Sequence, residues 1–101
     1  MPVKVIIKRK FNNPDFKKIS EMLVQARTNA MGESGYISSE TLVNSTDPNE
    51  IVVLSMWEKK EDWDNFKDSP PRRELEAIFS EMLESPTQAT VYKMGMAREP
   101  Y

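Results

Sequence analysis

The chain has 101 residues, of which 39% are hydrophobic and 30% charged, a balance typical of one globular domain and not of a disordered chain. The formal net charge is −2 with both signs mixed along the sequence, which excludes the one-sided basic surface that nucleic acid requires. Cysteine and histidine are both absent, which excludes disulfides, thiolate metal sites, cysteine nucleophiles and histidine bases. No apolar run is long enough to cross a membrane and the first residues do not resemble a signal peptide, so we expect a cytoplasmic protein without a metal.

The first predicted element is a strand over residues 3–10. Alternation places Val3, Val5 and Ile7 on one face and leaves Ile6 on the other. Because both faces carry apolar side chains, we expect neighbours on both sides of this strand.

A helix is predicted next. Asn13 has the chemistry of an N-cap, and Pro14 suits the first helical position because its missing N–H is not needed there. Gly32 is predicted to end the helix as a left-handed cap. An apolar stripe at spacings of three and four comprises Phe16, Ile19, Leu23, Ala26 and Ala30.

Two further strands are predicted to form a hairpin. The stretch 35–42 is amphipathic, which is typical of a strand near a sheet edge, and the segment 44–49 is dense in turn formers. The run 51–57 is so apolar and β-branched that it indicates a strand buried on both faces. Helices of one chain cover only one face of such a sheet, so we expect a second copy on the other face and hence a homodimer.

The last third of the chain is predicted to hold two helices and a strand. Residues 60–68 suit a short helix, and Pro70 starts a second one because proline is tolerated only in the first turn. Pro86 is predicted to end that helix, and residues 87–94 form the last strand. The resulting order, β-α-β-β-α-α-β, is an α+β fold of the ferredoxin-like, split βαβ plan with a four-stranded antiparallel sheet. The apolar stripe of the second helix comprises Leu75, Ile78, Phe79 and Met82.

Three stretches in this order carry a family resemblance. They are residues 35–42 before the turn at 47–49, residues 53–58 followed by Glu61-Asp62-Trp63, and the segment from Ser69 to Leu75. Together they resemble the antibiotic biosynthesis monooxygenase family of dimeric α+β barrels, over nearly the whole chain. The resemblance implies one domain over residues 1–101. The family includes cofactor-free enzymes that oxidise phenolic substrates with dioxygen and proteins without known activity.

The same resemblance argues against haem chemistry. The family's haem-degrading branch needs Asn on the first strand, Trp on the short helix and His on the next helix. The matching positions here hold Ile7 or Lys8, Phe66 and Glu76. We therefore expect no productive haem binding and no cofactor.

Four aromatic residues are candidate walls of a pocket between sheet and helices, and each is also explained as an ordinary core residue. Arg72 and Arg73 either steer an anionic substrate or pair with surface carboxylates. The proton-transfer candidates are Glu40, Tyr36 and Glu76, and a carboxylate serves as a base only where burial makes it more basic. The four aromatic candidates for substrate binding are Trp57, Trp63, Phe66 and Phe79.

Two functions remain open from the sequence. One is a cofactor-independent monooxygenase acting on a small aromatic or quinol-like substrate. The other is a non-catalytic dimeric module that binds an apolar ligand or a protein. Polar side chains converging on an enclosed cavity favour the enzyme, whereas a filled core favours the module.

Overall fold

The structure is a computed structural model that describes residues 2–12 and 15–95, and it has the predicted α+β, ferredoxin-like order of elements. The predicted helix start at Asn13 and Pro14 lies outside the described residues. None of the described helices is both long and apolar enough to cross a membrane. The elements are β1 (Val3–Lys10), α1 (Phe16–Met31), β2 (Tyr36–Val43), β3 (Glu50–Trp57), α2 (Lys60–Lys67), α3 (Pro70–Ser80) and β4 (Gln88–Lys93).

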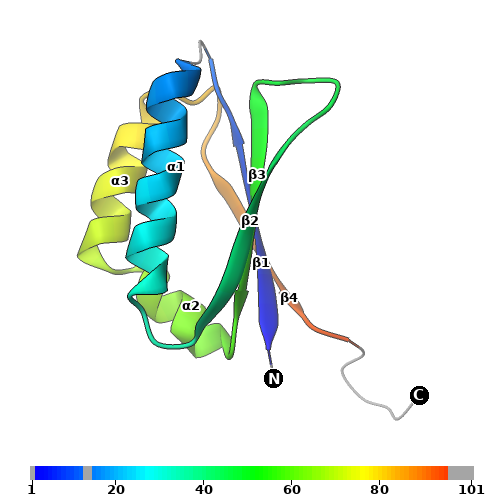
Figure 1. The fold of residues 1–101 in the computed structure, drawn as a ribbon, viewed down its shortest axis with the longest axis vertical. Helices are drawn as coiled ribbons and strands as arrows, with labels where there is room; N and C mark the ends of the chain where they lie inside the picture. Colours follow the sequence, from blue (N-terminus) through cyan, green and yellow to red (C-terminus); the bar gives the residue numbers. More distant parts are fainter. Residues whose placement is uncertain (1, 13–14, 96–101) are drawn as a thin grey trace.

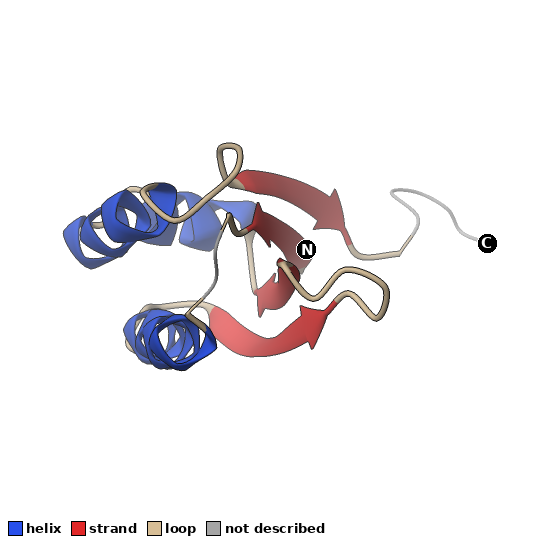
Figure 2. Ribbon diagram, turned by 90° about the horizontal axis from the view of Figure 1, so that it is seen from above, coloured by secondary structure: helices blue, strands red, loops and turns tan. Residues whose placement is uncertain are grey.

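The four strands form one antiparallel sheet in the order β2-β3-β1-β4, so β2 lies at an edge as predicted. Figures 1 and 2 show all three helices on the same face of this sheet. A register shift in β2 between Tyr36 and Ser38 leaves Ile37 as the extra residue of a bulge. Tyr36, beside this bulge, pairs with Trp57, and the centroids of their rings lie 5.6 Å apart.

The helix-covered face of the sheet holds the core. Every second residue of β1 is buried, in the order Val3, Val5, Ile7 and Arg9. The apolar core divides into one cluster around Trp57 and another in which Phe11 packs against Phe79 at the far end of the sheet. The space between the two clusters is where the candidate site lies.

The opposite face of the sheet carries no helix among the described elements (Figure 2). Within the single chain the outer residues of β3, Val52, Leu54 and Met56, are only half-buried, so the prediction that both faces of β3 are buried depends on the second copy and stays a prediction. They lie beside Ile6 of β1, which is also half-buried. An apolar surface of this kind is left open to a further layer.

The first helix starts and packs differently from its predicted pattern. Asp15 is the N-cap, and its side chain accepts a hydrogen bond of 3.2 Å from the Lys18 backbone N–H. Phe16, predicted to lie in the apolar stripe, is 52% exposed, and Met22 is buried in the stripe instead. The stripe thus begins a full turn later than the spacing suggested.

Gly32 does not adopt the predicted left-handed conformation. Its φ is −81°, within the right-handed region, and its N–H bonds to the Ala30 carbonyl. In this connection the left-handed residue is Gly35, with φ +85°, at the entry to β2. A Cβ there would lie 2.1 Å from the Asp62 carboxylate, so both the turn and the close approach of α2 require glycine.

The helix α3 is shorter than predicted, ending at Ser80 instead of continuing to Pro86. The chain leaves the helix because Leu83 forms a β-bridge with Phe11, and the Glu84 N–H donates to the Lys10 carbonyl over 2.8 Å. These contacts join positions more than 70 residues apart in sequence, and no local spacing indicates them.

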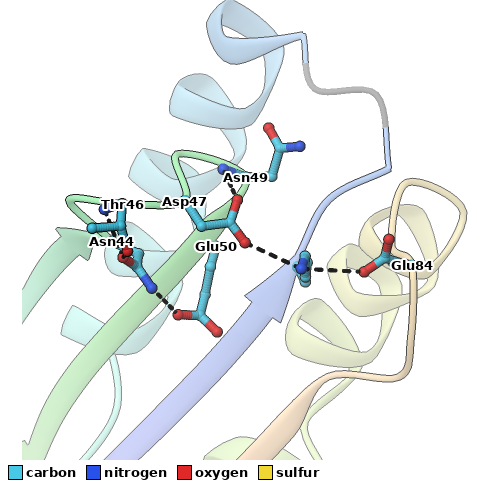
Figure 3. Close-up of polar contacts among 7 residues, drawn as sticks. Asn44, Thr46, Asp47, Asn49, Glu50 and Glu84 are labelled. Atoms are coloured by element: carbon cyan, nitrogen blue, oxygen red, sulfur yellow. Dashed lines mark hydrogen bonds and ion pairs between the residues drawn. The ribbon is translucent and has the colours of Figure 1, made fainter.

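The turn between β2 and β3 is built as its composition predicted (Figure 3). Asn44 accepts from the Thr46 N–H over 2.9 Å, and its amide donates to Glu50 over 2.6 Å. Asp47 accepts from the Asn49 N–H over 3.1 Å in the same manner.

Lys10 joins this turn to the segment after α3. Its Nζ lies 3.1 Å from the Asp47 carboxylate and 3.6 Å from that of Glu84. The hydrogen bond with Asp47 raises the pKa of Lys10 and lowers the pKa of Asp47. Because these groups are on the surface, water screens the pairs and their contribution to stability is small.

Candidate functional site

A cavity of about 50 Å³ lies between the sheet and the three helices. β1, β2 and β3 form its floor, and side chains of α1, α2 and α3 form its walls. The structure brings together all four predicted aromatic candidates, because Trp57, Trp63, Phe66 and Phe79 all line this cavity.

Three of these aromatic rings also pack on one another. The rings of Trp57 and Phe66 are stacked, with centroids 5.2 Å apart and an interplanar angle of 26°. The Trp63 ring lies 6.2 Å from that of Trp57 in a tilted arrangement. The Trp57 indole N–H donates to the Ser55 hydroxyl over 3.1 Å. The aromatic residues are therefore core residues and cavity walls at once.

The cavity is small and adjoins a second hollow. At about 50 Å³ it holds on the order of three or four water molecules. Pockets for drug-sized ligands are commonly about 300–1,000 Å³. An open groove of about 300 Å³ lies outside it, between α1 and α3, and Asn29 and Leu75 line both hollows. These two side chains form the boundary between the cavity and the groove.

A charged cluster occupies one side of the cavity. Glu76 of α3 accepts a hydrogen bond from Arg9 Nη2 through Oε1 and another, of 2.9 Å, from the Thr87 hydroxyl through Oε2. The Arg72 guanidinium lies 3.8 Å from the same Oε1. Burial on its own would raise the pKa of Glu76, but the two arginines and the hydroxyl outweigh burial and lower that pKa.

Arg9 and Thr87 are the members of this cluster that the sequence did not indicate, and Arg9 is the buried one. Its side chain is only 5% exposed, and its guanidinium lies 4.2 Å above the centre of the Phe79 ring. The signal was present in the alternation of β1, which places position 9 on the same face as Val3, Val5 and Ile7. A charged residue on a core-facing position of a strand is unusual and marks a possible site.

Two further arginines line the cavity. Arg72 lies over Trp63, 5.2 Å from the ring centre, and burial lowers its pKa. Arg27 of α1 donates to the Ser39 hydroxyl and carbonyl oxygen, over 3.2 and 3.0 Å. Glu76 is the one carboxylate among the lining residues, so the described walls carry three guanidinium groups against one negative charge.

The three predicted proton-transfer candidates are not brought together. Glu40 is exposed, and its neighbours Ser39 and Thr41 line the cavity while Glu40 does not. The Tyr36 hydroxyl shares a hydrogen bond of 2.9 Å with Ser39, and its ring packs edge-on against the core. Glu76 alone reaches the cavity. Its lowered pKa is the opposite of the change that a general base needs.

No group of three or more acidic side chains within residues 2–12 and 15–95 is placed to hold a metal ion.

The sequence pattern of the family described as Antibiotic biosynthesis monooxygenase matches residues 2–78 of the chain. The chain belongs to this family. Among proteins with curated descriptions, none matches the sequence.

Solved structures share the antibiotic biosynthesis monooxygenase fold at low sequence identity. Rv0793 from Mycobacterium tuberculosis is 21% identical with a TM-score of 0.82, over 97% of this chain and 100% of that one. SnoaB, a cofactor-independent oxygenase from Streptomyces nogalater, is 7% identical with a TM-score of 0.83, over 95% of each chain. Protein SO0527 from Shewanella oneidensis is 13% identical with a TM-score of 0.78, over 90% of this chain and 88% of that one. These likenesses establish the fold.

Proposed function

We propose that this antibiotic biosynthesis monooxygenase family member is a cofactor-independent monooxygenase acting on a small aromatic or quinol-like substrate. The observation that carries the proposal is a largely enclosed cavity with aromatic walls and a convergent polar cluster of Arg9, Arg72 and Glu76. Family membership and the fold shared with SnoaB, a cofactor-independent oxygenase, support the reaction type.

The chemistry needs no histidine, because an electron-rich substrate supplies its own electrons. In an anthrone, the methylene group between the rings loses two hydrogens to dioxygen, one oxygen atom forms a new C=O bond, and the other leaves as water. In a hydroquinone, one oxygen atom enters the ring to give a hydroxyquinone, and the other again leaves as water. The protein has to bind the substrate, orient it and favour its deprotonated form. Guanidinium groups beside the ring favour a developing oxyanion, and the aromatic walls hold the ring. Glu76 holds Arg9 and Arg72 in place in this scheme and is not the base.

A substrate ring requires more room than the cavity now offers. A cavity of roughly 150 Å³ is known to hold benzene, about three times the volume present here. The boundary at Asn29 and Leu75 is the short path to the larger groove outside. We propose that α1 and α3 separate at these two side chains when substrate enters.

Oxygen uptake with a panel of hydroquinones and anthrones tests the reaction, with no flavin or metal added. We expect consumption of dioxygen above the rate of the protein-free solution. Leu75→Trp fills the boundary between cavity and groove and lowers this rate at least tenfold. Val24→Trp adds the same ring on the exposed side of α1, where Val24 is 64% exposed, and leaves the rate unchanged. No uptake above background for the whole panel would overturn the proposal.

A second function is favoured by one observation, the small volume of the cavity. A non-catalytic dimeric module of the same fold would have aromatic side chains that mainly fill its core, as Trp57 and Phe66 partly do here. It would bind an apolar ligand or a protein without converting anything. Ligand binding with no product and no oxygen uptake selects this alternative.

We also propose that the protein is a homodimer joined through the outer face of its sheet. The support is the half-buried apolar row Ile6, Val52, Leu54 and Met56, which no described helix covers. Burial of this row against the same row of a second copy would remove apolar surface from water on both chains.

A further inference from the structure

The guanidinium group of Arg9 is buried but not fully satisfied. One of its terminal nitrogens donates to Glu76, while its Nε is buried and meets no acceptor in the described part of the chain. Each N–H of a buried guanidinium that lacks an acceptor costs stability, because the group has given up its hydrogen bonds to water. Arg9 is only 5% exposed and lines the cavity.

The charge around Arg9 is also unbalanced. Glu76 is shared between Arg9 and Arg72, so the buried cluster holds two positive charges and one negative charge. Asp68 makes no ion pair with Arg72 within the described part of the chain and is exposed to water. Buried charges in proteins are normally paired, so an excess guanidinium beside a cavity indicates a missing anion.

We propose that the cavity binds the carboxylate of an aromatic acid between Arg9 and Arg72. The inference rests on the proposed function and narrows it, since the substrate then carries an acidic group as well as an electron-rich ring. Guanidinium groups recognise carboxylates through charge-assisted hydrogen bonds, often two at a time.

The two hollows suit the two parts of such a ligand. As it stands, the inner cavity, at about 50 Å³, takes a group the size of a carboxylate and not a ring. The outer groove, of about 300 Å³, offers the apolar side chains of Pro71, Leu75 and Ile78 to the ring while the carboxylate enters. The ring then follows between the aromatic walls when α1 and α3 separate at Asn29 and Leu75.

Benzoate and the neutral benzamide form a matched pair of probes, measured by calorimetric titration of the full chain. Benzoate binds with saturation at one molecule per chain, and benzamide binds at least tenfold more weakly. The chain has two tryptophans, Trp57 and Trp63, and both line the cavity, so intrinsic fluorescence gives a second readout from the site itself.

Arg72→Gln removes the less buried of the two cations and keeps the Arg9–Glu76 pair that the fold needs. We expect this variant to bind benzoate at least tenfold more weakly, while its affinity for benzamide is unchanged. Arg73→Gln is the control, because it makes the same charge change one residue along, at an exposed position that does not line the cavity. The inference would be overturned if benzoate did not bind or if the two probes bound with equal affinity. It would also be overturned if Arg72→Gln and Arg73→Gln had equal effects.

Oxygen uptake separates this inference from the proposed reaction. If the reaction is correct, 2,5-dihydroxybenzoate is oxidised faster than 2,5-dihydroxybenzamide, and Arg72→Gln removes the difference. Benzoate binding together with no oxygen uptake for the dihydroxy compounds or the panel of hydroquinones and anthrones would overturn the reaction and leave the acid site standing. Equal oxidation of the two dihydroxy compounds would overturn the acid site and leave the reaction standing.

Discussion

Glu76 holds two guanidinium groups and a hydroxyl at the inner side of α3, and it does so from a side chain that is 19% exposed. Ion pairs in such places add little net stability over apolar residues of similar volume, yet removing one partner is costly because the other charge stays buried. Arg9, Glu76 and Arg72 therefore act as one unit, and substitutions among them are not independent.

A double-mutant cycle tests this coupling. Glu76→Leu should lower the free energy of unfolding by about 3–5 kcal/mol, because it leaves Arg9 buried without its carboxylate partner. Arg9→Leu should cost less, because Glu76 keeps Arg72 and the Thr87 hydroxyl as partners. The double variant should lose clearly less than the sum of the two single losses, measured by urea unfolding. Additive losses would show that the two side chains do not depend on each other. Arg73→Leu, at an exposed position of the same helix, serves as the control.

The lowered pKa of Glu76 predicts how stability depends on pH. In the unfolded chain this carboxyl titrates near its ordinary value of 4.5, and in the folded protein it titrates lower because Arg9 and Arg72 outweigh burial. Its contribution is therefore complete above 4.5 and is lost as the pH falls through the lower, folded value. Urea unfolding on both sides of pH 4.5 should show that the Glu76→Gln variant loses less unfolding free energy on acidification than the unchanged protein does.

Asp47 provides the comparison for that experiment. The hydrogen bond from Lys10 also lowers its pKa, so its contribution has the same sign and is lost on acidification too. Its carboxylate is on the surface, however, where water screens the pair. Asp47→Asn should therefore change the loss of unfolding free energy on acidification less than Glu76→Gln does. If Asp47→Asn had the larger effect, the acid-dependent stability would not come mainly from Glu76.

At the scale of elements, regular alternation was enough to place β1, whose observed bounds Val3–Lys10 equal the predicted ones. The same alternation places Arg9 on the core-facing side, but arginine is usually exposed to water, so its burial was not predicted. The ends of α1 and α3 were harder, because they depend on a cap at Asp15 and on the distant bridge between Phe11 and Leu83. Local sequence carries only part of that information.

Gly35 and Gly32 make a matched pair for a test at this scale. Gly35→Ala should lower the free energy of unfolding by about 2 kcal/mol or more, because the left-handed conformation disfavours a Cβ and that Cβ would meet Asp62. Gly32→Ala should stay within about 1 kcal/mol of the unchanged protein, because its φ is −81° and its nearest neighbour to a Cβ is 3.7 Å away. Thermal and urea unfolding measure both. Equal losses would contradict this account of the turn.

At the scale of the whole molecule, the order of elements and the sheet followed from the sequence because each element has its own period and turn signals. The aromatic walls of the site also followed, since large apolar residues on the core-facing side must meet between sheet and helices. The volume of the cavity and the sharing of Glu76 by two arginines depend on packing between α3 and β1, which are far apart in sequence. Spacing alone does not specify such distances.

The dimer proposal belongs to this scale as well. Sedimentation at micromolar concentration should show a species of twice 11.7 kDa for the unchanged chain. Leu54→Lys places a charge in the middle of the outer apolar row and should shift the protein to the 11.7 kDa species. Val24→Lys makes a similar change on the exposed side of α1 and should leave the dimer intact. A monomer in the unchanged chain would contradict the proposal.

The position of β1 inside the sheet has a consequence for how the chain folds. Its two neighbours are β3 and β4, so the first strand in the sequence remains incompletely paired until residues 88–93 arrive. A chain shortened to the family-matched residues 2–78 would end within α3 and lack β4. The free side of β1 would then present a row of unpaired N–H and C=O groups, a template on which further chains can add by strand pairing. We therefore expect β4, which contributes no residue to the cavity wall, to act as the cover that prevents aggregation.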